Sequence, residues 1–522
     1  MPYQLEPFHS IPLDEELLEL LIDEHETITL PRLKRLWSYY RNALAEPNER
    51  GGSLGAPAQA AGLPPRFSGS IDLELEERED REIVIENDIA WRIQTLVDFM
   101  FPEAPRLLSR AIDPARAALI ERVLEAVFAA NGGDSLWQDA ALLGAVYGHV
   151  DFLLGCDALT PAKSWRHEGK HGARREGGAD HTPRAGATSS PAFMPPSLRE
   201  HDDVVVRLAK QLTVEIVEPP RAIPLLNRTD YRIIDAYIIH AHQLTNEVER
   251  SGWLARLTRA MRARSGRGTR RATVAVTEII SPTRRQRYEN GELVSETVNT
   301  LGRLPVVHVQ NLSQPLHYHG ISDVEPLIPL QDELNTRLSD RAFRVTMQSF
   351  RMWLGKGIDG FTDRPIGPGQ MWLTDNPNAS IEAFGGDADS PSERAHIEEL
   401  REALDKASGV TPAAAGHIKA RVGNLTSENA LRISLMGTIA KIKRKRITYG
   451  GGIAQLCELV LHALDVHGIL RTEPHERRID VVWADPIAAD ESRKIADALA
   501  KAQLGVPTAV LRAELGYADA AD

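Results

Sequence analysis

Three histidines that lie close together in the sequence are the first candidates for chemistry: His308, His317 and His319. If residues 317–319 form a strand, both imidazoles of this His-Tyr-His run point to the same side, as two ligands of one metal ion would. No third ligand is evident beside them. A turn or a position in the core is therefore the favoured interpretation.

Other patterns that carry chemistry are few. The chain has no GxxxxGK[ST] phosphate-binding loop and no CxxC pair. The histidines within residues 161–203 are irregularly spaced, and the carboxylates of residues 73–80 are typical of a solvated charge run. We therefore predict no catalytic, cofactor-binding or metal-binding residues, and a protein that is not an enzyme.

Basic residues gather at three places in the sequence. Residues 33–44 mix aromatic and basic side chains, and residues 256–271 carry seven arginines with 256 and 271 included. Residues 33–44 could bind nucleic acid, but packed rings and solvated charges are the favoured interpretation. Residues 256–271 could contact nucleic acid or an acidic partner, and a solvated basic loop is the alternative. The third cluster directly precedes a run of three glycines and consists of Lys441, Lys443, Arg444, Lys445 and Arg446.

Composition limits the class of protein. A chain of 522 residues is long enough for roughly three or four domains. Its net charge of −12 is unlike that of a protein that grips DNA along its length, although an acidic wall could let DNA slide. No apolar run is long enough to cross a membrane. The beginning of the sequence lacks the order of a secretion signal, and two distant cysteines fit synthesis in a reducing compartment.

The element most clearly predicted is one long helix over residues 322–350. An apolar residue recurs every three or four positions. These stripe residues are Leu327, Leu330, Leu334, Leu338, Ala342 and Val345. About 28 helical residues span roughly 40 Å. A rod with so narrow an apolar stripe needs neighbours to cover it.

The remaining pattern predicts an α+β fold. Helices are expected over residues 86–101, 115–129, 135–152 and 392–410, and in two short pieces near the end of the sequence. Strands are expected within residues 204–310, with a hairpin turn at Asn290-Gly291, and again within 477–486. Residues 46–70 and 161–203 are expected to be a linker and an exposed insertion. A long helical pattern from 425 to 466 contains Gly450, Gly451 and Gly452, which predict a bend.

Several of these stretches together resemble the portal proteins of tailed bacteriophages, in particular the SPP1-like portal family. The resemblance lies in residues 36–42 (LWSYYRN), 86–90 (ENDIA), 301–311 (LGRLPVVHVQN), 319–340 (HGISDVEPLIPLQDELNTRLSD), 425–432 (LTSENALR) and 479–490 (IDVVWADPIAAD). Residues 319–340 are the most specific. Asn42 and Glu428 stand where the family commonly has glycine, and the 161–203 insertion is not a family feature.

The resemblance implies a division of the chain into the parts of a portal subunit. These parts are an α/β wing (1–321), a stem helix (322–350), a small strand-containing clip (351–391), a second stem helix (392–410), a tunnel loop (411–424), a long kinked wing helix (425–466) and a C-terminal strand with helical crown (467–522). A ring of such subunits, usually twelve, would sit at one vertex of the capsid. Double-stranded DNA would be packaged and ejected through it.

The implied partners are the terminase large subunit, the major capsid or scaffolding protein and the head–tail connector or adaptor protein. The protein would be made in the host cytoplasm and end in the virion, with no membrane contact and no cofactor. Expected DNA-channel residues are Lys419 and Arg421 of the tunnel loop, with the basic cluster Lys441, Lys443, Arg444, Lys445 and Arg446. Expected docking residues of the clip are Lys356, Asp359, Phe361, Arg364 and Trp372. The alternatives are another virion structural subunit and a metal-dependent nucleic-acid enzyme.

Overall fold

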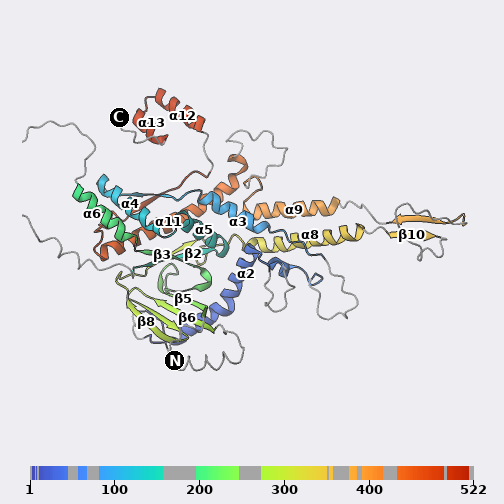
Figure 1. The fold of residues 1–522 in the computed structure, drawn as a ribbon, viewed down its shortest axis with the longest axis horizontal. Helices are drawn as coiled ribbons and strands as arrows, with labels where there is room; N and C mark the ends of the chain where they lie inside the picture. The colour runs from blue at the N-terminus through green and yellow to red at the C-terminus, as the bar shows by residue number, and fades with distance from the viewer. Residues whose placement is uncertain are drawn as a thin grey trace, which may run out of the picture. The chain divides into compact units, whose positions relative to one another are not determined.

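The structure is a computed structural model, shown as a ribbon in Figure 1. It describes residues 3–5, 8, 11–44, 57–67, 82–156, 196–245, 272–349, 352–356, 376–384, 391–414, 432–486 and 491–515. The chain forms two compact units. The larger unit contains Met1–Trp37, Ile93–Asp323 and Gly416–Asp522, and the smaller unit contains Ser38–Arg92 and Val324–Ala415.

Helices of the larger unit surround a three-stranded antiparallel sheet of order β3-β2-β9. The sheet consists of β2 (His149–Gly155), β3 (Thr213–Val217) and β9 (Val306–Gln310). The helices whose buried residues share its core are α4 (Pro114–Ala130), α5 (Asp134–Tyr147), α6 (Pro196–Ala209) and α11 (Met436–Val466), with the end of α3 (Asp88–Met100). A two-stranded sheet of β1 (Arg106–Ser109) and β12 (Ile479–Val482) adds to this core through Ile479.

A five-stranded antiparallel sheet of order β4-β5-β6-β7-β8 is the second sheet of the larger unit. Its strands are β4 (Ala222–Leu226), β5 (Ile234–Thr245), β6 (Ala272–Ile280), β7 (Arg284–Glu289) and β8 (Glu292–Val298), and a short helical turn, η5 (Pro219–Arg221), precedes it. The start of the chain packs on this sheet, because Phe8 and Leu18 share a core with Ile238 and Ile279. Leu18 lies on α1 (Glu15–Glu24), which continues through the π-helical turn η2 (His25–Thr29) into α2 (Leu30–Arg41).

The smaller unit is built around two helices, α8 (Ile328–Ser349) and α9 (Pro391–Ser408), which lie side by side (Figure 1). Ile397, Leu400 and Leu404 of α9 are buried, and Arg344 of α8 pairs with Glu393 of α9. Between the helices in sequence lie β10 (Met352–Lys356) and β11 (Ser380–Phe384), which pair antiparallel. The short turns η3 (Ala58–Gly62) and η7 (Glu325–Leu327) complete this unit, while α12 (Glu491–Gln503) and α13 (Thr508–Glu514) end the described part of the larger one.

Most of the predicted elements are confirmed, including the α+β class. The hairpin turn between β7 and β8 has positive φ at Asn290 (51°) and Gly291 (80°), as its sequence demands. Three predictions are wrong. The long helix expected over 322–350 begins at Ile328, after the turn η7. Residues 204–208 belong to helix α6, because Val205 and Ala209 are needed in the core beside α4. The helix expected over 135–152 ends at Gly148 (φ 96°), after which β2 begins.

The long helix α11 remains helical across the glycines where the sequence predicted a bend. A side chain at Gly452 would collide with Val309 of β9. A glycine therefore lets the helix approach the sheet closely at this point. Residues 425–431, with which the prediction began this helix, lie outside the described residues.

Candidate functional site

The Gly-Ile-Ser-Asp run of residues 320–323 contacts the end of α5. Ser322 Oγ donates a hydrogen bond of 2.5 Å to Val146 O, and the backbone N–H of Asp323 donates one of 2.8 Å to Ala145 O. A Cβ on Gly320 would lie 2.7 Å from Leu312 O, which is too close for any other residue. The run that carried the strongest resemblance thus has a structural reason for its glycine and its serine.

Asp323 is the centre of a buried ion-pair group. Its carboxylate accepts a hydrogen bond of 2.8 Å from Asn311 Nδ2, lies 2.7 Å from Lys441 Nζ, and pairs with Lys445 Nζ. The three charged side chains are 1%, 11% and 2% exposed, respectively. Burial by itself raises the pKa of Asp323, but Lys445 and Lys441 hold it well below its usual range. Burial lowers the pKa of Lys445, and Asp323 opposes that effect.

This group accounts for two of the seven basic residues expected at a DNA channel. Lys441 and Lys445 point into the protein toward Asp323, whereas Lys443 and Arg444 on the same helix are exposed. Arg446 donates to the backbone carbonyls of Ala484, Phe99 and Met100 and lies over the Trp483 ring. Lys419 and Arg421 lie outside the described residues.

A second polar group, in the smaller unit, joins three of the stretches that carried the resemblance. We call it the Gln59 group: Tyr39, Gln59, Asn87, Asp332 and Asn335. Tyr39 donates to Asp332 Oδ1 (2.6 Å), Gln59 Nε2 donates to Tyr39 O (2.7 Å) and Asn87 Oδ1 (2.9 Å), and Asn335 Nδ2 donates to Gln59 Oε1 (3.0 Å). Gln59 and Asn335 are both fully buried. The 46–70 stretch, predicted as a linker, therefore supplies a buried residue.

Three polar residues of α8 also bind the extended segment at residues 84–88. Ser339 Oγ accepts from Val84 N (3.0 Å), Asn335 Oδ1 accepts from Glu86 N (3.0 Å), and Gln331 Oε1 accepts from Asp88 N (3.2 Å). Four helical residues rise about 6 Å and two extended residues about 6.6 Å, so the two repeats stay in register. This match holds the segment along the helix without a strand partner.

Backbone geometry in the smaller unit explains two further residues. A Cβ on Gly62 would collide with Tyr39 Oη and Asp332 Oδ1, which are joined by a hydrogen bond. Asn42 has φ 45°, a left-handed conformation that asparagine tolerates better than most residues. Asparagine can therefore occupy a position where the family commonly has glycine.

Arg92, at 1% exposure, fastens α3 to the end of α9. Its guanidinium donates to Asp88 (3.1 Å), Asp405 (2.6 Å) and the carbonyl oxygen of Val410 (2.6 Å). The hydrogen-bond acceptors come from two helices and from Val410, two residues after α9, so the side chain sets how they pack within the smaller unit.

The docking residues expected in the clip are mostly beyond the described part of the chain. Lys356 ends β10 and is exposed. Asp359, Phe361, Arg364 and Trp372 lie outside the described residues, as do the basic residues 256–271 and the insertion from 161 to 195.

His308 belongs to a buried hydrogen-bonded network around Asp151, which sequence reasoning did not single out. Asp151 is fully buried and accepts from Tyr237 (2.6 Å) and Tyr318 (3.1 Å), and it lies 2.6 Å from His308 Nδ1. Burial raises the pKa of Asp151, but His308 and the other partners hold it below its usual value. His149, also buried, packs its ring against His308, and burial lowers its pKa to about 3.

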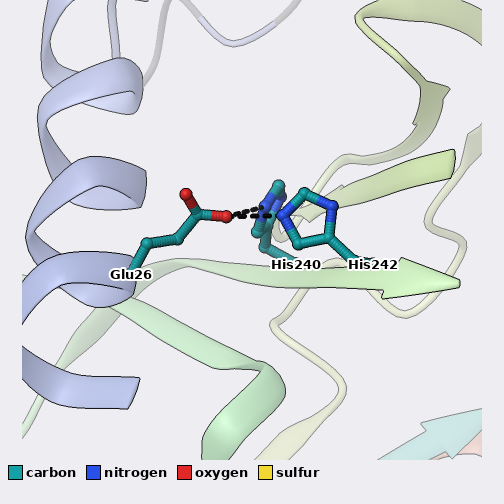
Figure 2. A group of neighbouring side chains, drawn as sticks. All are labelled: Glu26, His240 and His242. Atoms are coloured by element: carbon teal, nitrogen blue, oxygen red, sulfur yellow. Dashed lines mark hydrogen bonds and ion pairs between the residues drawn. The ribbon is translucent and has the colours of Figure 1, made fainter. Parts of the chain in front are cut away.

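Among the described residues, one group of side chains has the composition of a metal site: Glu26, His240 and His242 (Figure 2). Glu26 Oε1 lies 3.2 Å from His240 Nε2 and 2.7 Å from His242 Nε2. The histidines are two residues apart on β5, and Glu26 comes from η2, more than 200 residues earlier. The i, i+2 spacing was visible in the sequence, but the distant carboxylate was not.

Two short runs match hydrolase motifs in letters alone: GGSLG at residues 51–55 and HEGKH at 167–171. Both lie outside the described residues. Such motifs carry function only in a defined strand–turn–helix or helix context.

The family model described as "Phage portal protein, SPP1 Gp6-like" matches residues 204–519. Among solved structures, the chain is similar to one from the neck of an empty GTA particle (11% identity, TM-score 0.42, 82% of this chain and 90% of that chain). It is also similar to one from the virion of a native gene transfer agent particle (12%, 0.38, 82% and 89%). No curated protein matches. None of the described helices is long and apolar enough to cross a membrane.

Proposed function

Because the chain belongs to the SPP1 Gp6-like family of phage portal proteins, we propose that it forms the ring at one capsid vertex through which double-stranded DNA is packaged and ejected. Members of this family are structural components of the virion and not enzymes, and membership implies a homo-oligomeric ring. The observation that carries the proposal is the family match, which covers more than half of the chain.

Exposed apolar side chains on helices of both units support a ring. Of the stripe residues, Leu327 in η7 and Leu334 in α8 are fully buried within this chain, but Val345 of α8 is 52% exposed. On α11, Ile433 just before the helix, Met436 and Ile447 are 70%, 67% and 75% exposed. Exposed apolar side chains on long helices are what a neighbouring subunit would cover.

We assign portal parts to the described elements on this basis. Helices α8 and α9 form the stem, and the β10–β11 pair belongs to the clip that docks the terminase motor and later the head–tail connector. The long helix α11 is the wing helix, residues 411–424 are the tunnel loop, and α12 and α13 form the crown. A ring of twelve subunits is expected, bound to the major capsid or scaffolding protein.

Mass photometry and negative-stain imaging of the purified full chain test the proposal. Rings with a central hole and a mass near twelve copies are expected. Val345→Asp should reduce ring formation while leaving the thermal unfolding of the chain unchanged, and Val298→Asp, on exposed β8, should leave rings intact. A stable monomer under conditions that preserve the fold would contradict the proposal.

A further inference from the structure

The group Glu26, His240 and His242 joins the first helical segment to the five-stranded sheet within the larger unit (Figure 2). We propose that these three side chains bind one divalent transition-metal ion of the Zn²⁺ class, which fastens that segment to β5. Two imidazole nitrogens and one carboxylate oxygen form a ligand set that suits zinc. No part of this proposal depends on the role of the protein in a ring.

The backbone directs the side chains of Glu26, His240 and His242 toward one point. Alternate residues of a strand face the same side, so His240 and His242 of β5 are directed toward the same neighbour. That neighbour is η2, where one π-helical turn interrupts the helix formed by α1 and α2. Single π-turns inside helices are frequent at functional sites, because they re-aim one side chain out of the regular pattern. Here the re-aimed residue is Glu26.

His240 has a hydrogen-bond partner that can orient its ring as a metal ligand. Its Nδ1 lies 2.9 Å from Thr277 Oγ1 on the adjacent strand β6, and this contact is buried. When Nδ1 carries the proton and donates it to Thr277, the lone pair of Nε2 points toward Glu26. Metal-bound histidines are generally oriented by such a hydrogen bond from the second ring nitrogen.

The protonation states also suit a cation. Burial lowers the pKa of His240, against the influence of Glu26, so the ring is neutral at pH 7. The hydrogen bond from His242 lowers the pKa of Glu26 more than burial raises it, so the carboxylate is ionised. His25 directly precedes Glu26, but its ring is engaged elsewhere, because its Nε2 lies 2.9 Å from Pro220 O. The site therefore offers a neutral imidazole at His240 and a negative charge at Glu26.

The distances leave only small movements to be made. Ligand atoms about 2.0–2.1 Å from a tetrahedral ion lie about 3.3 Å from each other. The Glu26–His240 distance of 3.2 Å matches that value, the Glu26–His242 distance of 2.7 Å needs to open slightly, and all three ligand atoms lie within 4.8 Å of one another. The side chain of His242 is 51% exposed, so an ion can enter from its side and keep a water ligand there.

A titration of chelator-treated full-length protein with Zn²⁺, and with Co²⁺ as a visible-absorbing substitute, tests the site. Wild-type protein should bind one ion per chain at this site, and the Co²⁺ complex should show the intense d–d bands of a four- or five-coordinate ion. Glu26→Gln and His242→Gln should each remove this binding. Thr277→Val should weaken it by about 10–100-fold, because the orienting hydrogen bond to His240 is lost.

Three matched variants separate this site from other sources of binding. Glu24→Gln changes an exposed carboxylate on α1, and His317→Gln changes an exposed histidine elsewhere; both should bind as wild type does. His171→Gln removes a histidine of the HEGKH run and should also leave this binding intact. Each variant is first checked by circular dichroism. Absence of binding in wild-type protein, or binding that survives His242→Gln and disappears with His171→Gln, would overturn the proposal.

Discussion

Asp323 has a role in the structure that its place in the sequence did not indicate. In the sequence it opens a predicted helix, and Lys441 and Lys445 belong to a basic cluster. In the structure the carboxylate forms ion pairs with both ammonium groups in a nearly dry environment. Removing one member of a buried ion pair leaves an uncompensated charge, which is costly.

Asp323→Asn is therefore expected to destabilise the larger unit by about 3–5 kcal/mol, because two lysines would lose their counter-charge. Lys445→Met should cost less, since Lys441 still balances the carboxylate. Urea unfolding followed by tryptophan fluorescence measures both. Lys443→Met, at the exposed position between them, is the control and should stay within about 0.5 kcal/mol of wild type. Equal effects of Asp323→Asn and Lys443→Met would refute the buried group.

His149 predicts a pH dependence of stability. Burial lowers its pKa to about 3 in the folded chain, whereas an unfolded histidine titrates near about 6.5. The folded state therefore binds the proton less readily, so its stability is full above about pH 6.5 and falls as the pH drops toward the folded value. At pH 5 this loss amounts to about 2 kcal/mol.

The midpoint of urea unfolding, measured between pH 7 and pH 5, tests this expectation. His149→Gln should show a smaller decline than wild type over the same interval. His240, His319 and His467, whose pKa values burial also lowers, contribute the same sign in both proteins and largely cancel in the comparison. The exposed His317→Gln variant should decline like wild type; if His149→Gln does so as well, the assignment fails.

At the scale of elements, the smaller unit is held by polar contacts along α8. Gln331, Asn335 and Ser339 recur every four residues and bind an extended segment that advances two residues at a time. The Gln59 group then closes over the start of that helix. Gly62 is the tightest point, because the space for a side chain is filled by the hydrogen-bonded Tyr39 and Asp332.

Gly62→Ala is expected to destabilise the smaller unit by about 1–3 kcal/mol, since the added methyl group must separate Tyr39 from Asp332. Gly451→Ala is the matched control. It lies within α11, and no atom lies within 4 Å of the added Cβ. There the same change should stabilise the chain by up to about 1 kcal/mol, the helix preference of alanine over glycine. Differential scanning calorimetry of both variants gives the two signs; the same sign for both would contradict this account.

At the scale of the whole molecule, the proposed conduit needs weak contacts with DNA, which the net charge of −12 favours over a tight grip. Of the five clustered basic residues, Lys443 and Arg444 are the two whose side chains are exposed in the described part of the chain. We keep the prediction of phosphate contact for these two, and for Lys419 and Arg421 of the tunnel loop.

The double change Lys443→Glu and Arg444→Glu should lower DNA packaging several-fold without affecting ring assembly, because it reverses two charges at the surface. Packaged DNA per particle, measured by nuclease protection, is the readout. Arg512→Glu in α13 changes a charge at a distant part of the chain and serves as the control. Unchanged packaging and ejection in the double variant would remove these residues from the channel.

Local sequence determined much of this protein. Helix periodicity located α3, α4, α8 and α9, and the Asn290-Gly291 pair identified the β7–β8 turn, because hydrogen-bonding period and turn conformation are decided within a few residues. The family resemblance also rested on short runs. Tertiary structure overrode propensity at residues 204–208 and 149–152, where packing in the core selected a helix and a strand against the local signal.

Only the tertiary structure decided the groups made by residues far apart in the chain. Gln59 meets Asn335, Asp323 meets Lys441 and Lys445, and Glu26 meets His240 and His242, across separations from 118 to 276 residues. Each partner by itself is an ordinary polar or charged residue. Its role arises because burial removes water and leaves another part of the chain as its partner, and no local pattern in the sequence records that encounter.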